Sequence, residues 1–154
     1  MRIEIPGRER WELKSLVLDF NGTLASGGIL LPGVGDRLRA LSRDLRIDVV
    51  TADTYGTVVA QMEQANVRYT LTQVQRGTEK VAHVVALGAD QVAAIGNGCN
   101  DTLMLRAARL GIAVIGEDGA AGEALMAADI VCRSIVDALA LLQDPNKLIA
   151  VLRL

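Results

Sequence analysis

The sequence contains few cysteines, no long apolar run and no excess of basic residues, and each shortage excludes a class of protein. Its two cysteines, Cys99 and Cys132, stand far apart and form no metal-type pair, so we expect reduced thiols and no zinc site. Apolar residues make up 51% of the chain. They never reach the ~18 uninterrupted residues of a membrane span, so a membrane partner is not expected.

Net charge and the first residues narrow the protein class further. Sixteen lysines and arginines against eighteen aspartates and glutamates give a net charge of −2, without the basic stripe that is typical of nucleic-acid binders. Residues 1–7 alternate polar with apolar side chains and lack the apolar core of a secretory signal. The sequence therefore predicts a cytoplasmic protein that has no nucleic-acid partner.

Short apolar segments alternate with segments of helical period along most of the chain, a pattern typical of a parallel sheet with helices on both faces. The predicted strands lie at 13–20, 47–51, 68–71, 92–95, 112–115 and 130–132. The predicted helices lie at 33–44, 54–65, 78–88, 100–109, 119–127 and 134–143, with a last short helix or tail after Pro145. We expect one three-layer, doubly wound α/β domain of Rossmann-like type over residues 1–154, with a mostly parallel sheet.

Two short segments lie outside this pattern of strands and helices. In Ile3–Ile5 apolar and polar side chains alternate, and Pro6 and Gly7 follow, which predicts a short N-terminal strand in a hairpin or at a sheet edge. Gly27–Leu31 predicts a flexible flap that ends in exposed apolar residues.

Candidate site residues gather where the predicted strands end, and the carboxyl ends of parallel strands are where ligands bind in such sheets. They are Asp19, Asn21 and Gly22 after the first core strand, Thr51 and Ala52 after the second, Lys80 near the start of a helix, and Asn97 and Asp101 after the strand at 92–95. Phosphoryl transfer needs a carboxylate nucleophile, a divalent cation held by oxygen ligands, and donors for the phosphoryl oxygens. This set of residues can supply all three.

The same motifs resemble those of the haloacid dehalogenase-like superfamily of aspartyl-phosphate phosphotransferases, over essentially the whole chain. The matching motifs are Asp19-Phe20-Asn21-Gly22-Thr23-Leu24, Thr51, Lys80 and Gly96-Asn97-Gly98-Cys99-Asn100-Asp101. The last motif is especially similar to that of the P-type ATPase phosphorylation domain and its soluble relatives. The resemblance implies that Asp19 is the nucleophile and that Thr51, Ala52, Gly22 and Lys80 bind the phosphoryl group. It further implies that Mg²⁺ is held by Asp19, the Asn21 carbonyl and Asn97, and that Asp101 completes the metal site by holding a metal-bound water or pairs with Lys80.

Two asparagines depart from the family pattern. Asn21 stands where phosphatases of the superfamily carry an acid–base aspartate, help that is worth ~10²–10⁴ in rate. We therefore expect slow turnover or good leaving groups. Asn97 keeps a carbonyl oxygen for Mg²⁺ but removes a negative charge, which predicts weaker metal binding. Both asparagines precede glycine, so spontaneous deamidation would restore the usual aspartates.

No cap domain is expected, because residues 24–50 and 52–79 have room for only one helix and one strand each. An open site has no lid of its own to exclude water. Either a second copy of this chain covers it, or the phosphorylated substrate is itself large, such as a phosphoprotein or a polymer end.

Several residues have simpler interpretations. Asp53 is expected to cap the following helix, and His83 to be a packed or surface histidine. The loop that contains Gly116, Gly119 and Gly122 has the wrong spacing for a dinucleotide site and predicts a turn before a helix.

Two functions remain open at this point. The first is a slow, Mg²⁺-dependent phosphatase or phosphotransferase that works through phospho-Asp19. The alternative is a catalytically weak relative that senses phosphate or binds a protein. In this alternative Asn21 and Asn97 reflect a loss of catalytic activity.

Overall fold

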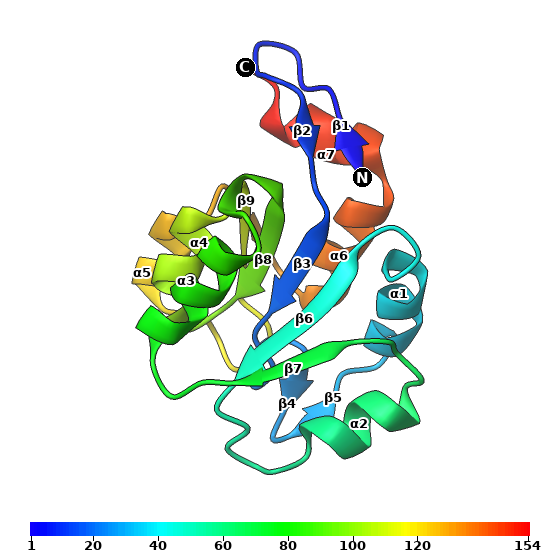
Figure 1. Cartoon of the computed structure of the whole chain (residues 1–154), viewed down its shortest axis with the longest axis vertical. Helices are drawn as coiled ribbons and strands as arrows, with labels where there is room; N and C mark the ends of the chain where they lie inside the picture. The colour runs from blue at the N-terminus through cyan, green and yellow to red at the C-terminus, as the bar shows by residue number, and fades with distance from the viewer.

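The computed structural model describes residues 1–154, and its centre is a six-stranded sheet in the order β10-β9-β8-β3-β6-β7. The strands are β3 (Ser15–Leu18), β6 (Arg46–Thr51), β7 (Thr70–Gln73), β8 (Val92–Gly96), β9 (Leu110–Val114) and β10 (Ile130–Cys132). Every neighbouring pair is parallel. The predicted three-layer α/β fold is confirmed, and the central sheet is wholly parallel (Figure 1).

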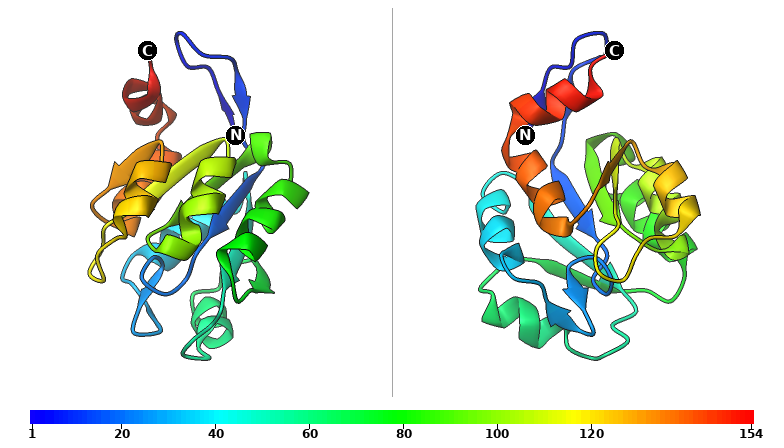
Figure 2. Two further views of the ribbon diagram at one scale, coloured as in Figure 1. Left: turned by 90° about the vertical axis from the view of Figure 1, so that its left-hand side faces the viewer. Right: turned by 180° about the vertical axis from the view of Figure 1, so that it is seen from behind.

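Helices cover both faces of this sheet. They are α1 (Val34–Leu41), α2 (Val58–Gln64), α3 (Gly77–Ala86), α4 (Thr102–Ala107), α5 (Gly122–Ala127), α6 (Ile135–Gln143) and α7 (Pro145–Leu152), with short 3₁₀ helices η1 (Ala89–Gln91) and η2 (Cys99–Asp101). Helices α1, α2 and α6 lie on one side, and α3, α4 and α5 lie on the other (Figure 2). None of these helices has the length and apolar character that crossing a membrane would require.

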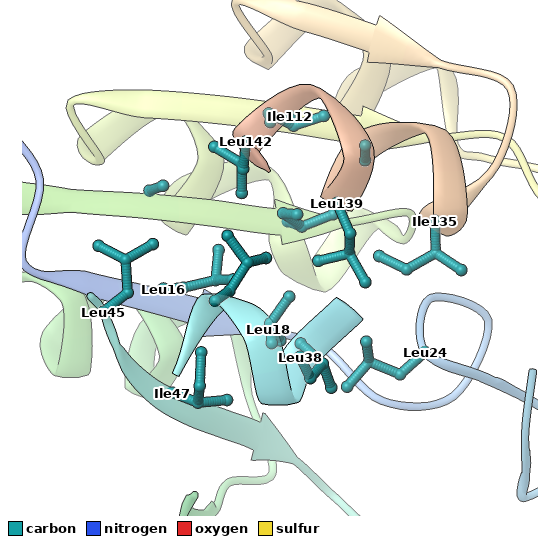
Figure 3. Close-up of a cluster of buried hydrophobic side chains, with 14 of the residues drawn as sticks. Leu16, Leu18, Leu24, Leu38, Leu45, Ile47, Ile112, Ile135, Leu139 and Leu142 are labelled. Carbon is teal, nitrogen blue, oxygen red and sulfur yellow. The ribbon is translucent and has the colours of Figure 1, made fainter. Parts of the chain in front are cut away.

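The apolar core is divided in two by the sheet. Leu16 and Leu18 of β3 belong to a cluster of 30 buried residues, whereas Val17 between them belongs to a cluster of 11 on the opposite face. Successive strand side chains point to opposite faces, so a strand covered on both sides must be apolar throughout. Figure 3 shows the larger cluster, in which these leucines lie near Leu38 of α1 and Leu139 of α6.

Several predicted boundaries differ from the structure by two to four residues. The helix expected at 54–65 begins only at Val58, because Asp53 adopts a left-handed conformation (φ 48°) and residues 53–57 form a turn. The strand expected at 68–71 lies at Thr70–Gln73, where its register pairs Thr70 with Asp48 of β6. The first difference follows from the local turn at Asp53, and the second follows from pairing with β6.

Two small hairpins lie outside the main sheet. The predicted N-terminal strand is confirmed: β1 (Arg2–Ile3) pairs with β2 (Trp11–Glu12), and this hairpin lies beside α7 (Figure 1). The predicted flap is a second antiparallel hairpin, β4 (Ala25–Ser26) with β5 (Ile29–Leu30), which the sequence did not predict as strands.

The predicted absence of a cap is confirmed. Between Thr23 and Thr51 the chain forms only β4, β5, α1 and β6, and between Thr51 and Lys80 it forms only α2, β7 and the first turn of α3. The carboxyl edge of the sheet therefore has no separate domain over it.

Candidate active site

Asp19 directly follows β3, in the middle of the sheet. Its backbone N–H donates to the carbonyl of Ile95 on β8 (3.0 Å), which continues the strand pairing beyond β3 itself. The residue is only 6% exposed. The sheet therefore places a carboxylate almost out of solvent at the edge where β3 and β8 end.

Lys80 reaches this carboxylate from the second turn of α3. Its Nζ lies 2.7 Å from Asp19 Oδ1 and 2.6 Å from Asp101 Oδ1, and the lysine side chain is 1% exposed. Charged residues at the start of a helix are usually exposed to solvent. The burial of Lys80 therefore argues against an ordinary surface lysine. The predicted residues Asp19, Lys80 and Asp101 thus meet in one cluster.

Asp101 is wholly buried, and both of its oxygens have partners. Oδ1 accepts from Lys80, and Oδ2 accepts from the backbone N–H groups of Asn97 (3.0 Å) and Gly98 (2.9 Å). Gly96 leaves room for this side chain, since a Cβ there would come within 2.5 Å of Asp101 Cγ. Asp101 holds Lys80 and the turn at 97–98 in place, and its contact with a metal stays a prediction.

Thr23 is a site residue that the predicted set omitted. Its Oγ1 lies 3.1 Å from Asp19 Oδ2 and 3.3 Å from Asn97 Oδ1, and the residue is 1% exposed. One hydroxyl proton can serve only one of these oxygens at a time. The signal was present in the sequence, because Thr23 belongs to the same motif as Asp19.

Asn97 is oriented by the loop that follows β9. The backbone carbonyl of Asn97 accepts from the Ala121 N–H (2.8 Å). The side-chain Nδ2 of Asn97 donates to the Gly119 carbonyl (3.1 Å). This contact fixes the amide so that Oδ1 faces Thr23 and, beyond it, Asp19. The loop that contains Gly119, which the sequence predicted as a turn before a helix, therefore also positions Asn97, a predicted metal ligand.

The turn after Asp19 depends on Gly22, which has a φ of 80°. A Cβ at this position would come within 2.6 Å of Asn97 Nδ2, so no other residue fits without displacing that side chain. The Gly22 N–H donates to the Ala25 carbonyl (2.7 Å). This N–H is therefore already used, and the phosphoryl-binding role of Gly22 stays a prediction. Asn21 Oδ1 is buried without a hydrogen-bond partner.

Thr51 ends β6, the strand beside β3, and is 2% exposed. Its Oγ1 accepts the N–H of Asp53 (3.1 Å), which leaves the hydroxyl proton free. Ala52 follows at the surface. No hydrogen bond joins Thr51 to Asp19 or Lys80, so the phosphate-binding role of Thr51 and Ala52 stays a prediction.

Asp53 and His83 have structural partners away from the cluster. Asp53 Oδ1 accepts the N–H groups of Thr57 (3.0 Å) and Val58 (3.3 Å). The N-cap residue of α2 is Thr57, so Asp53 supports the turn before this helix and is not its cap as predicted. His83 Nε2 lies 3.1 Å from the buried carboxylate of Asp48 on β6. His83 is therefore the packed histidine that the sequence predicted.

The cluster has unusual electrostatics. Burial raises the pKa of Asp19 from 3.8 to about 6; the Asp101 charge adds to the rise, and Lys80 and Thr23 oppose it. Burial lowers the pKa of Lys80, but the two carboxylates raise it by more, so the lysine keeps its proton. One cation between two buried carboxylates leaves a net negative charge, which favours a further cation.

The oxygen atoms around Asp19 fit a magnesium ion. Asp19 supplies a carboxylate, Asn97 Oδ1 lies near the same Thr23 hydroxyl as Asp19 Oδ2, and no backbone N–H donates to the Asn21 carbonyl. Mg²⁺ binds hard oxygen ligands and retains waters, so few protein ligands suffice. Because Asn97 offers an amide oxygen and no carboxylate, this group of oxygens carries less charge than two aspartates would give it.

Comparison with known proteins agrees with the motifs. A family model described as haloacid dehalogenase-like hydrolase matches residues 73–138, the part of the chain that contains Lys80 and Asp101. A curated relative, an uncharacterized protein of Methanocaldococcus jannaschii, is 43% identical over 84 residues, which cover 50% of this chain and 90% of that protein. The chain belongs to the haloacid dehalogenase-like hydrolase superfamily.

Solved structures share its fold. The 3-deoxy-D-manno-octulosonate 8-phosphate phosphatase of Moraxella catarrhalis, in complex with magnesium, phosphate and KDO, superposes with a TM-score of 0.67 at 19% identity, covering 88% of this chain and 89% of that one. The cobalt-bound deoxy-D-mannose-octulosonate 8-phosphate phosphatase of Haemophilus influenzae gives 0.67 at 16% identity, covering 92% and 90%. At these identities the likeness is one of fold.

Proposed function

We propose that this protein is a Mg²⁺-dependent phosphatase or phosphotransferase that forms an aspartyl-phosphate on Asp19. The strongest support is the buried Lys80 bridge, which brings together three separate parts of the chain around one carboxylate. Asp19 and Asp101 alone would repel a phosphoryl group. Lys80 offsets one of their charges, and a magnesium ion would supply two further positive charges to the phosphoryl oxygens.

Asp19, the Asn21 carbonyl and Asn97 are the residues that would hold the ion. In the first chemical step, a carboxylate oxygen of Asp19 bonds to phosphorus while the bond from phosphorus to the leaving oxygen breaks. Lys80 holds the nucleophile by Oδ1 and Thr23 approaches Oδ2, so the carboxylate has a fixed orientation. Thr51, with its free hydroxyl proton, is the proposed donor to a phosphoryl oxygen.

Asn21 determines the rate of turnover that we expect. Its amide can accept a hydrogen bond at the unpartnered Oδ1, and can thus orient a water, but it cannot give or take a proton. The leaving group must therefore depart without a general acid, and hydrolysis of the aspartyl-phosphate proceeds without a general base. We infer a long-lived phosphoenzyme, in line with the resemblance of the fourth motif to P-type ATPases.

The phosphorylated substrate must fit a site that no cap covers. With no cap over the site, we propose either a macromolecular phosphoester or coverage by a second copy of this chain. Ile29 in the flap is 59% exposed and Tyr55 in the neighbouring loop is 58% exposed. The flap and this loop meet where Thr57 Oγ1 donates to the Gly28 carbonyl at 2.6 Å. A light-scattering mass that matches one chain would exclude the second copy.

Intact-protein mass spectrometry tests the proposed function. The protein is incubated with Mg²⁺ and acetyl phosphate and followed over time, with Asp19→Asn as the matched control. We expect a phosphate-sized gain that requires Mg²⁺ and is absent from the control. Absence of any adduct, together with no Mg²⁺-dependent shift in melting temperature, would contradict the enzyme.

The second candidate is a catalytically weak module that senses phosphate or binds a protein. Asn21 and Asn97 favour it, because they remove a proton shuttle and a metal-site charge. Asn21→Asp separates the two functions: faster loss of the phosphoenzyme in this variant indicates an otherwise competent site. A variant that still forms no adduct favours the binding module.

A further inference from the structure

A second concave site lies at the opposite end of β6 from the active site. The cavity measures about 560 Å³ and lies where β6 and β7 begin, beside the turn that follows α1. Its lining includes Arg43, Arg46 and Arg68, with Tyr69 and Asp44. Arg46 begins β6 and Thr51 ends it, so at ~3.3 Å per residue the cavity is roughly 16 Å from the active-site edge.

Arg46 is held in a fixed orientation by a buried carboxylate. Its Nε lies 2.8 Å from Asp48 Oδ2 and its Nη2 donates to Asp48 Oδ1 at 2.9 Å. The Asp48 side chain is wholly buried, whereas 51% of the Arg46 side chain is exposed. Two of the five guanidinium N–H groups at most are directed at Asp48, and the remainder can bind a ligand.

Arg43 and Arg68 have no carboxylate partner. No acidic side chain lies within ion-pair distance of either guanidinium, although most other arginines of the chain have such a partner or a hydrogen bond. Asp44 is the one acidic residue of the lining and forms no ion pair. The cavity is therefore positive, in a chain whose net charge is −2.

Tyr69 gives the cavity a partly apolar wall. The residue is half-buried against the larger core cluster, and its hydroxyl makes no hydrogen bond to the protein. A volume of this size is typical of small-molecule sites, which combine an apolar wall with a few convergent polar groups. Arginine forks match phosphate oxygens in geometry as well as charge.

We propose that this cavity binds a small polyvalent phosphate anion, at a site separate from the active site. Arg46 is the pre-oriented contact, because Asp48 fixes it before the ligand arrives. Arg43 and Arg68 supply the charges that no protein carboxylate neutralises. Pyrophosphate is the simplest probe, since it carries several charges and no further recognition groups.

Isothermal titration with pyrophosphate in metal-free buffer tests the site. The wild-type chain is compared with Arg43→Gln/Arg68→Gln, and with Arg106→Gln, which removes an exposed and unpaired arginine on α4. We expect saturable 1:1 binding that is weaker by about tenfold or more in the double variant, as expected for lost charge-assisted hydrogen bonds. The Arg106 control should bind within about twofold of the wild type.

Three results would overturn the proposal. They are unchanged affinity in the double variant, an equal loss in the Arg106 control, which would show diffuse charge attraction, and no saturable binding to the wild type. If the double variant fails to fold, Arg43→Gln and Arg68→Gln are titrated separately, and each should weaken binding. Asp19→Asn should bind pyrophosphate like the wild type, which separates this cavity from the active site.

Discussion

Lys80 Nζ and Asp19 Oδ1 lie 2.7 Å apart, although 61 positions separate the two residues in sequence. The lysine is on a helix that crosses one face of the sheet, and the aspartate follows the central strand. The same ammonium group contacts Asp101 at 2.6 Å, and all three side chains are buried. This bridge joins the first, third and fourth motifs, and the predictions below depend on it and on its neighbours.

Replacing Lys80 should lower the free energy of unfolding by more than replacing a surface lysine does. Lys80→Met leaves two buried carboxylates with no cation between them, and breaking such a pair costs about 3–5 kcal/mol. Urea unfolding of metal-free protein measures the loss. The control is Lys147→Met, whose lysine side chain is 73% exposed and whose loss should cost no more than about 0.5 kcal/mol. Equal effects would show that the bridge carries little energy.

Magnesium affinity should weaken in acid. Burial holds the pKa of Asp19 at about 6, above its usual 3.8, so below this value the folded, metal-free protein carries a proton that the ion must displace. Below pH 6 the affinity should fall about tenfold per pH unit, and above pH 7 it should change little. Calorimetric titration at pH 5, 6 and 7.5 measures this dependence. A flat profile would show that Asp19 is ionised throughout or is not a ligand.

Restoring aspartate at the two asparagine positions should have different effects on stability. Asn97→Asp loses the donor to Gly119 and sets a carboxylate against that carbonyl, so the metal-free protein should lose about 1–3 kcal/mol. Asn21→Asp breaks no hydrogen bond at Oδ1, which has no partner. Urea unfolding with and without Mg²⁺ compares them, and the ion should recover part of the Asn97→Asp loss. Full stability of metal-free Asn97→Asp would contradict the anchoring role of Gly119.

The folded protein should resist deamidation at both Asn-Gly pairs. Deamidation needs the glycine nitrogen to attack the asparagine side chain, and both nitrogens are hydrogen-bonded. Gly22 N–H donates to the Ala25 carbonyl and Gly98 N–H donates to Asp101 Oδ2. Peptide mass mapping of aged samples should find unmodified asparagines in buffer and deamidation in urea. Equal rates in both would mean that these turns open readily.

Much of this fold was predictable because local patterns determine it. A strand buried on both faces must be apolar, which made the segments around Leu16 and Ile112 recognisable. Boundaries failed where specific hydrogen bonds decided them: the Asp53 side chain holds the turn before α2, and pairing with β6 sets the start of β7 at Thr70. The β4–β5 hairpin has only two residues per strand, too few for a periodic signal.

The sequence by itself determined the chemistry that is available: the carboxylates, the lysine, the two amides and their order along the chain. Only the tertiary structure decided which atoms face each other. It buried Lys80 between two carboxylates, added Thr23 to the site, and oriented Asn97 through the hydrogen bond that its Nδ2 donates to a loop beyond β9. The physical reason is that residue types follow from sequence alone, whereas burial and hydrogen-bond partners depend on segments that meet only when the sheet has formed.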